Sequence, residues 1–177
     1  MKIPSNIIRE FLNTQAKHVS HYIVAHSYYH PYHKQAHDIK QMTFNLQKDL
    51  RHARNCLNKE LYGNGARRKP LLYQPLFIPT LEGTTNTANP QLTLHYNIYL
   101  GNIPSAYTTE TIHQAWTYCW HTKAHQKNDI YIAVPQPNTQ SHLINYGTKE
   151  LQIGNVECWD IMNTQIPYNA FITASVD

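Results

Sequence analysis

The sequence predicts an α+β domain in which helices pack on one face of an antiparallel sheet of about four or five strands. Segments that alternate apolar and polar residues, typical of strands, are separated by two long segments with helical periodicity. The chain has 177 residues, 41% of them hydrophobic, which is enough for one core. We therefore expect a single domain over residues 1–177, with its core at 20–152 and a C-terminal extension at 153–177.

The first elements are expected to be a helix, a strand and a long helix. Residues 3–17 carry one apolar stripe, and residues 21–29 are rich in β-branched and aromatic side chains. Residues 37–62 repeat an apolar side chain every three or four positions, which predicts an amphipathic helix. The histidine-dense segment between this strand and helix is expected to be a solvated loop, because Pro31 interrupts any regular element there.

The second strand, residues 71–83, is expected to be an edge strand or a bulged strand because it contains Pro75 and Pro79. A polar loop joins it to the next strand, so the two are expected to form an antiparallel hairpin. That pairing would bring Glu82 beside His95.

The clearest strand is Leu92 to Gly101, in which apolar and polar residues alternate. Leucine, tyrosine and isoleucine side chains define one face, and Thr93, His95, Asn97 and Tyr99 define the other. The alternation places His95 and Asn97 roughly 6.6 Å apart along one face of the strand.

The remaining elements are expected to be a helix at 108–123, a strand at 130–134, a short helix at 141–151 and a further strand at 156–162. Both tryptophans of the first of these helices are expected in the core. The central order is β-α-β-β-α-β, which is the split βαβ, or ferredoxin-like, arrangement.

The composition favours a soluble cytoplasmic protein that contacts a polyanion. The formal net charge is +4, and Arg67, Arg68 and Lys69 form a basic run that we predict to bind nucleic acid. No apolar run approaches the roughly 20 residues that a membrane-spanning helix needs, so no membrane partner is expected. The three cysteines lack metal-binding or disulfide spacing.

Glu82, His95 and Asn97 are predicted to bind a divalent cation. A carboxylate, an imidazole and a carboxamide oxygen on adjacent strands form a ligand set that suits Mg²⁺ or Mn²⁺ better than a structural zinc ion. The alternative is a sheet whose polar face is simply exposed to solvent.

The short helix at 141–151 carries a second group of polar residues. His142, Tyr146 and Lys149 are spaced so that they share one helix face. Gly147 costs about 1 kcal/mol of helix propensity, and we expect it to let a substrate backbone pass close to the helix. His142 is either a further metal ligand or phosphate contact, or an exposed bystander.

These motifs, in this order, resemble those of the HUH endonucleases, and most closely those of the rolling-circle replication initiators of plasmids and small DNA viruses or phages. His95-Tyr96-Asn97 aligns with the His-hydrophobic-His motif of that family, and Tyr146-x-x-Lys149 with its catalytic helix. The resemblance covers roughly residues 20–152. Asn97 stands where a second histidine is usual. This either supplies an amide oxygen as ligand, as Gln does in some virus-type initiators, or marks a weakened or lost metal site.

The resemblance implies a metal-dependent endonuclease and strand transferase that nicks and joins single-stranded DNA. Tyr146 would attack the scissile phosphate to leave a 5′-phosphotyrosine and a free 3′-hydroxyl, and Lys149 would favour the phenolate. The Mg²⁺ or Mn²⁺ ion would neutralise charge on that phosphate. The implied partners are single-stranded DNA or an origin hairpin, together with host replication proteins in the cytoplasm of a microbial host.

Two other functions remain open. One is a transposase or relaxase of the same superfamily. The other is a non-catalytic single-stranded nucleic-acid binder that kept the fold after its metal site degenerated, since basic residues with interleaved aromatics would serve that role as well.

Overall fold

A four-stranded antiparallel sheet forms the centre of the computed structural model, which describes residues 4–152 and 155–168. The strands are β1 (Val19–His26), β2 (Leu76–Glu82), β3 (His95–Gly101) and β4 (Ile130–Ala133), in the spatial order β2-β3-β1-β4. With a helix between β1 and β2 and another between β3 and β4, this order is that of the split βαβ fold. The predicted α+β class is confirmed.

The helices connect these strands and extend both ends of the described chain. They are α1 (Ser5–Gln15), α2 (Ala36–Tyr62), α3 (Asn64–Arg68), α4 (Thr109–Thr117), α5 (Gln140–Gly147) and α6 (Lys149–Gln152). Short turns are η1 (Ala16–His18), the π-helical η2 (Tyr118–Lys123), η3 (Val156–Cys158) and η4 (Ile161–Asn163).

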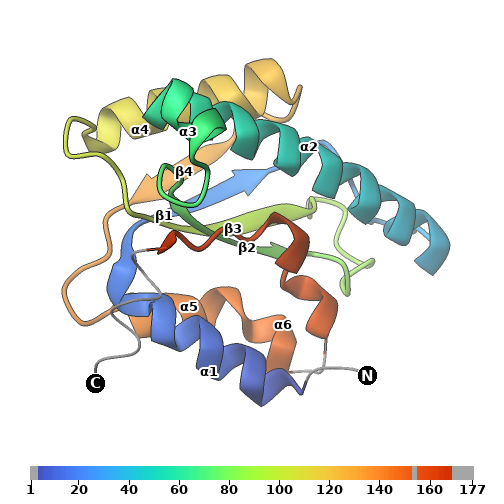
Figure 1. Ribbon diagram of the computed structural model, residues 1–177. Coiled ribbons are helices and arrows are strands. Elements are labelled where there is room, and N and C mark those ends of the chain that lie inside the picture. The colour runs from blue at the N-terminus through green and yellow to red at the C-terminus, as the bar shows by residue number, and fades with distance from the viewer. Residues whose placement is uncertain (1–3, 153–154, 169–177) are drawn as a thin grey trace.

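Helices cover both faces of the sheet, with α2 and α4 on one side and α1, α5 and α6 on the other (Figure 1). The prediction placed helices on one face of the sheet. The two helices that connect strands, α2 and α4, share one face as predicted, but α1, α5 and α6 cover the other. The second face is also buried because tyrosines stand where an exposed sheet would carry small polar residues. Tyr22 and Tyr99 lie there in a second hydrophobic cluster with Ile8 and Leu12 of α1.

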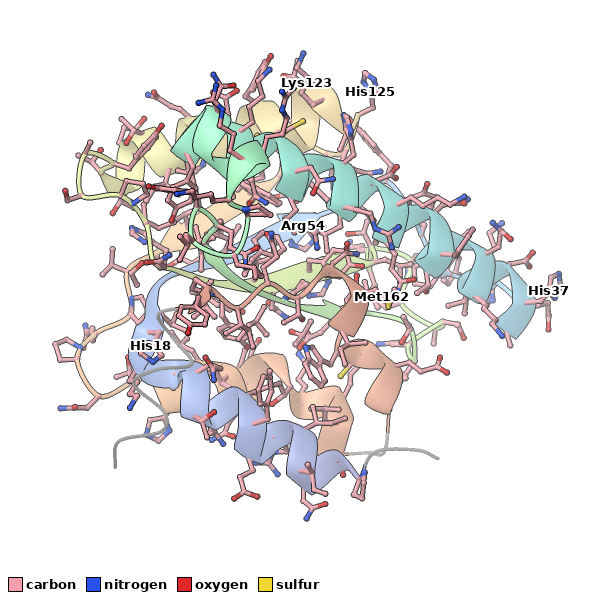
Figure 2. All side chains as sticks on the ribbon, in the orientation of Figure 1. His18, His37, Arg54, Lys123, His125 and Met162 are labelled. Atoms are coloured by element: carbon pink, nitrogen blue, oxygen red, sulfur yellow. The ribbon has the colours of Figure 1, made fainter. Side chains whose placement is uncertain are left out.

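The long helix α2 follows the predicted pattern closely. Its inward stripe is buried, with Leu46, Leu50, Ala53 and Leu57 at 0% exposure. Complete burial of a leucine side chain contributes about 1.5–3 kcal/mol, so this stripe anchors α2 to the sheet. The N-terminal end projects into solvent, where His37 is exposed (Figure 2).

The aromatic core lies between α2, α4 and the sheet. Trp116 and Trp120 are fully buried, and their rings stack with centroids 5.8 Å apart. Phe77 of β2 and Tyr96 of β3 pack edge-on or tilted against them. The prediction that both tryptophans belong to the core is confirmed.

The strand predicted at 156–162 is wrong, because the chain there forms η3 and η4. In the described part of the C-terminal segment, residues 155–168, isolated bridges join Trp159 to Thr80 and Gln165 to Phe77 of β2. The buried Asp160 carboxylate accepts hydrogen bonds from the backbone and side chain of Asn163, which turns the chain instead of extending it.

Asp160 also accepts a hydrogen bond from the hydroxyl of Tyr96, at 2.9 Å. Burial raises the pKa of Asp160, and the charge of Arg54 on α2 (labelled in Figure 2) partly offsets this effect. The described part of the C-terminal extension therefore packs on the sheet edge; residues 153–154 and 169–177 lie outside the described chain.

β2 lies at the sheet edge, as its prolines indicate. The carbonyl of Pro79 points away from β3 and accepts a hydrogen bond from the backbone of Asp160. β2 begins at Leu76 instead of residue 71, and β3 at His95 instead of residue 92. Within residues 4–152 and 155–168, no helix is both long and apolar enough to span a membrane.

Candidate functional site

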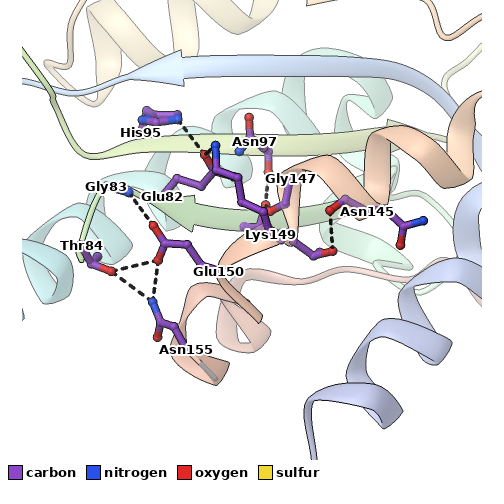
Figure 3. Close-up of polar contacts among 12 residues, drawn as sticks. Glu82, Gly83, Thr84, His95, Asn97, Asn145, Gly147, Lys149, Glu150 and Asn155 are labelled. Carbon is purple, nitrogen blue, oxygen red and sulfur yellow. Dashed lines mark hydrogen bonds and ion pairs between the residues drawn. The ribbon is translucent and has the colours of Figure 1, made fainter. Parts of the chain in front are cut away.

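Glu82 and His95 lie directly opposite each other on paired strands, as the predicted hairpin requires. In the β2–β3 register Glu82 pairs with His95, and both side chains lie on the face covered by α5 and α6. The Nε2 atom of His95 is 3.4 Å from Oε2 of Glu82 (Figure 3). Glu82 is only 3% exposed, so its carboxylate has little contact with water.

One hydrogen bond of His95 indicates which of its two ring nitrogens carries the hydrogen. Nδ1 lies 3.1 Å from the backbone carbonyl of Thr93, which can only accept, so Nδ1 carries a hydrogen. A neutral imidazole then presents the lone pair of Nε2 to the Glu82 carboxylate. Two acceptors at this distance are stabilised by a positive group: a proton on Nε2, a metal ion that both atoms ligate, or a cationic side chain beside them.

Lys149 supplies a positive charge at the same carboxylate. Its Nζ atom is 2.8 Å from Oε2 of Glu82 (Figure 3). Burial raises the pKa of Glu82, but the hydrogen bonds and charges of His95 and Lys149 outweigh it, and the net pKa is lowered. Partial burial lowers the pKa of Lys149, yet Glu82 raises it overall. Both groups are therefore held in their charged forms.

Tyr146, on the last turn of α5, contacts the ammonium of Lys149. It is 61% exposed, and Nζ of Lys149 is 4.8 Å from the centroid of its ring. Lys149 thus contacts both Tyr146 and Glu82, and links the predicted nucleophile to the predicted metal ligand. His142 is exposed on α5, and no contact in the described chain ties it to Glu82 or His95.

Asn97 lies deeper than the other predicted ligands. Its Oδ1 accepts a hydrogen bond from the hydroxyl of Tyr22 at 2.5 Å, and the residue is 2% exposed. Its Nδ2 has no hydrogen-bond partner among the described residues. The hydrogen bond from Tyr22 occupies one of the two lone pairs of this oxygen, which leaves the other for a metal. The structure therefore brings Glu82, His95, Lys149 and Tyr146 together, and places Asn97 beneath them with its oxygen engaged.

Gly147 lets α5 approach the sheet closely. A Cβ atom at this position would lie 2.0 Å from the Tyr99 hydroxyl and 3.2 Å from Cβ of Asn97. The carbonyl of Gly147 accepts a hydrogen bond from Thr80 at 2.7 Å, which fixes the end of the helix to β2. We expected Gly147 to make room for a substrate. In the structure it is buried, and it makes room for the sheet.

The helix predicted at 141–151 is broken at Thr148 into α5 and α6. Glu150 stabilises the break, because its side chain reaches the loop between β2 and β3. Its carboxylate accepts hydrogen bonds from the backbone of Gly83, the hydroxyl of Thr84 and the amide of Asn155 (Figure 3). This bend directs Lys149 toward Glu82, at the mouth of a cavity of about 470 Å³ that Glu82, His95 and Lys149 help to line.

The basic run does not reach this cavity. Arg67 and Arg68 end α3, Lys69 follows it, and all three are exposed. Figure 1 shows α3 with α2 and α4, on the opposite side of the sheet from α5 and α6. A role for these residues in nucleic-acid binding stays a prediction, and it would involve a surface separate from the candidate site.

The residues present suit a hard cation in part. In the described chain, no three His, Cys, Asp or Glu side chains converge as a metal-binding group. However, Oε1 of Glu82 is buried without a hydrogen-bond partner, and Nε2 of His95 faces the same carboxylate. Mg²⁺ is commonly held by one or two carboxylates together with waters and substrate phosphates. Glu82 and His95 therefore fit an ion whose other ligands would be waters and a phosphate of the substrate.

Sequence reasoning missed two neighbours of the site. His26, within the strand predicted at 21–29, ends β1, and its ring stacks on His95 with centroids 4.8 Å apart. Tyr22 holds the Asn97 amide from the adjacent strand. The register of β1 with β3 determines both contacts, and only the alternation in β1 could have indicated them.

No protein-family model matches the chain, and neither curated proteins nor solved structures show a match to it. Function is therefore argued from the site geometry and from the motif resemblance.

Proposed function

We propose that this protein is a single-strand-specific DNA nicking and joining enzyme that uses Tyr146 as its nucleophile and a divalent cation at Glu82 and His95. The observation that carries the proposal is the position of Lys149, whose ammonium contacts both the Tyr146 ring and the Glu82 carboxylate. An exposed phenol, a neighbouring ammonium and a buried carboxylate–imidazole pair are the groups that phosphoryl transfer to tyrosine requires.

In the proposed reaction, the Tyr146 oxygen loses its proton and attacks the scissile phosphorus. A phosphorus–oxygen bond to tyrosine forms, and the bond to the 3′-oxygen breaks; that oxygen takes up a proton to become a 3′-hydroxyl. Lys149 stabilises the negative charge of the attacking oxygen from about one helical turn away. Glu82 and His95 would hold Mg²⁺ or Mn²⁺, and the ion would offset charge on the phosphate.

The biological reaction we propose is initiation of rolling-circle replication of a plasmid or a small phage or virus, in a microbial cytoplasm. A free 3′-hydroxyl is what a polymerase extends, so single-stranded DNA or an origin hairpin and host replication proteins would be the partners. Transposition or conjugative transfer would use the same chemistry on another DNA.

A second candidate is a non-catalytic single-stranded nucleic-acid binder. It is favoured by the hydrogen bond from Tyr22 to Asn97, which engages the third predicted ligand oxygen. On this account Tyr146 would stack against a base instead of attacking a phosphate.

Formation of a covalent adduct separates the two candidates. Labelled single-stranded DNA is incubated with the protein and Mn²⁺, and the mixture is denatured before electrophoresis. We expect a labelled band at the mass of the protein plus DNA. Tyr146→Phe should abolish the band and leave DNA binding nearly unchanged, because only the attacking oxygen is removed.

Tyr131→Phe is the matched control, since Tyr131 on β4 is also 61% exposed. This variant should form the adduct normally. If Tyr146→Phe still forms it, another tyrosine is the nucleophile. If the wild-type protein binds DNA and forms no adduct with Mg²⁺ or Mn²⁺, the binder is the correct function.

A further inference from the structure

We propose that Lys149 is an internal counter-ion that occupies the cation position of the site, so that a divalent metal must displace its ammonium from Glu82 in order to bind. This inference rests on the proposed function, in that it concerns the same metal pair. It assigns Lys149 a second role: it controls how tightly the site binds metal before DNA arrives.

The geometry places the ammonium on the carboxylate oxygen that the metal would share with His95. Nζ of Lys149 lies 2.8 Å from Oε2 of Glu82, the oxygen that also faces Nε2 of His95. A hard divalent cation binds a carboxylate oxygen at about 2.0–2.6 Å. A metal shared by Glu82 and His95 would therefore bind the same oxygen as the ammonium and lie within about 5 Å of Nζ. The two like charges would repel each other strongly in this buried place, which favours displacement of the ammonium.

Of the partners in this contact, Lys149 is the one free to move. Glu82 belongs to a paired strand and is buried, whereas about half of the Lys149 side chain is exposed. The lysine stem is flexible, and the Tyr146 ring, 4.8 Å from Nζ, offers the ammonium a second favourable position. Displacement by metal would therefore move the charge of Lys149 toward the predicted nucleophile.

Charge balance explains why the site holds such a residue. A buried carboxylate without a positive partner is strongly unfavourable. Oε1 of Glu82 lacks a hydrogen-bond partner in the described chain. Without Lys149, His95 could offset the carboxylate charge if Nε2 carried a proton. Lys149 stabilises Glu82 in the metal-free protein, and this stabilisation is lost when metal binds. The apparent metal affinity is reduced by that amount.

The test is Mn²⁺ binding in the absence of DNA, measured by the loss of the electron paramagnetic resonance signal of free Mn²⁺. Lys149→Met removes the ammonium and keeps the stem. We expect its dissociation constant for Mn²⁺ to be roughly 10-fold lower than that of the wild-type protein. Lys59→Met is the matched control, because Lys59 is an exposed residue of α2 on the other face of the sheet. Its dissociation constant should equal that of the wild type.

A second measurement separates a change in Mn²⁺ affinity from a loss of folding stability in the variant. Thermal unfolding of Lys149→Met and of Lys149→Gln, which keeps a hydrogen-bond donor, is recorded with and without Mn²⁺. Both should unfold at a lower temperature than the wild type without metal, and Mn²⁺ should raise their midpoints more than it raises that of the wild type. Glu82→Gln should remove the effect of Mn²⁺ in each background.

Equal or weaker Mn²⁺ binding by Lys149→Met would overturn the proposal. So would a similar gain in Lys59→Met, which would indicate a general effect of net charge, or absence of Mn²⁺ binding in every variant. None of these results depends on DNA cleavage. A protein that forms the Tyr146 adduct and shows equal Mn²⁺ affinities would retain its proposed function and lose only this inference.

Discussion

Replacement of Gly147 by alanine should destabilise the protein, although alanine is the better helix former. The added Cβ would lie 2.0 Å from Oη and 3.1 Å from Cζ of Tyr99, and 3.2 Å from Cβ of Asn97. Tyr99 cannot easily withdraw, because it is 1% exposed and its hydroxyl donates a 2.9 Å hydrogen bond to the carbonyl of Leu143.

The magnitude follows from three contributions. Overpacking a buried site costs about 1–3 kcal/mol. Displacement of the Tyr99 hydroxyl from its acceptor costs a further 1–3 kcal/mol, approximately, because the group stays buried. The helix propensity of alanine returns about 1 kcal/mol. The net loss is therefore centred near 3 kcal/mol, which for a chain of this length lowers the unfolding midpoint by about 6–12 °C.

The assay is thermal and urea unfolding of Gly147→Ala in the wild-type and Tyr99→Phe backgrounds. Since Tyr99→Phe removes the atom at 2.0 Å, we expect the cost of Gly147→Ala to be at least about 1 kcal/mol smaller there. Gly65→Ala is the control, because its Cβ would meet only the half-exposed ring of Tyr73 at 3.0 Å. The reasoning is refuted if Gly147→Ala stabilises the protein, or if its cost is the same in both backgrounds.

Two further predictions concern buried carboxylates. The folded-state pKa of Glu82 is below the reference value of 4.5, so its stabilising contribution is complete above pH 4.5 and is lost as the pH falls through the folded pKa. In urea unfolding below pH 4.5, Glu82→Gln should therefore lose less stability on acidification than the wild type, and equal slopes would contradict this. Asp160→Ala removes the acceptor of the Tyr96 hydroxyl and of the Asn163 amide, and should cost at least about 2 kcal/mol in the same assay at pH 7. Asp160→Asn keeps one acceptor oxygen and should cost less; the opposite order would show that these hydrogen bonds do not stabilise the C-terminal segment.

Sequence reasoning succeeded where one period of apolar residues dominates a segment. The stripe of α2 and the alternation in β3 each imply one buried face, and the structure has those faces. The pairing of Glu82 with His95 was also predicted, because an antiparallel hairpin places the end of its first strand opposite the start of its second.

It failed where long-range contacts decide the conformation. Asp160 turns the C-terminal segment because it reaches Tyr96, a residue 64 positions earlier, and no local pattern reports that contact. The bend at Thr148 likewise depends on Glu150 reaching the backbone of Gly83. The helices on the second face were not expected, because the polar residues of β3 on that face suggested a surface exposed to solvent. In the structure Tyr22 and Tyr99 are buried there, and burial raises the pKa of both hydroxyls and keeps them neutral.

The position of α1 beneath the sheet has a consequence for synthesis on the ribosome. Arg9 donates a hydrogen bond to Asn145 across a sequence separation of 136 residues, and Ile8 and Leu12 share a cluster with Ile144. At translation rates of about 5–20 residues per second, the apolar side of α1 waits roughly 7–27 s before α5 is made. During that interval α1 is a candidate for chaperone binding, and the layer that carries Tyr146 is completed only after α5 is made.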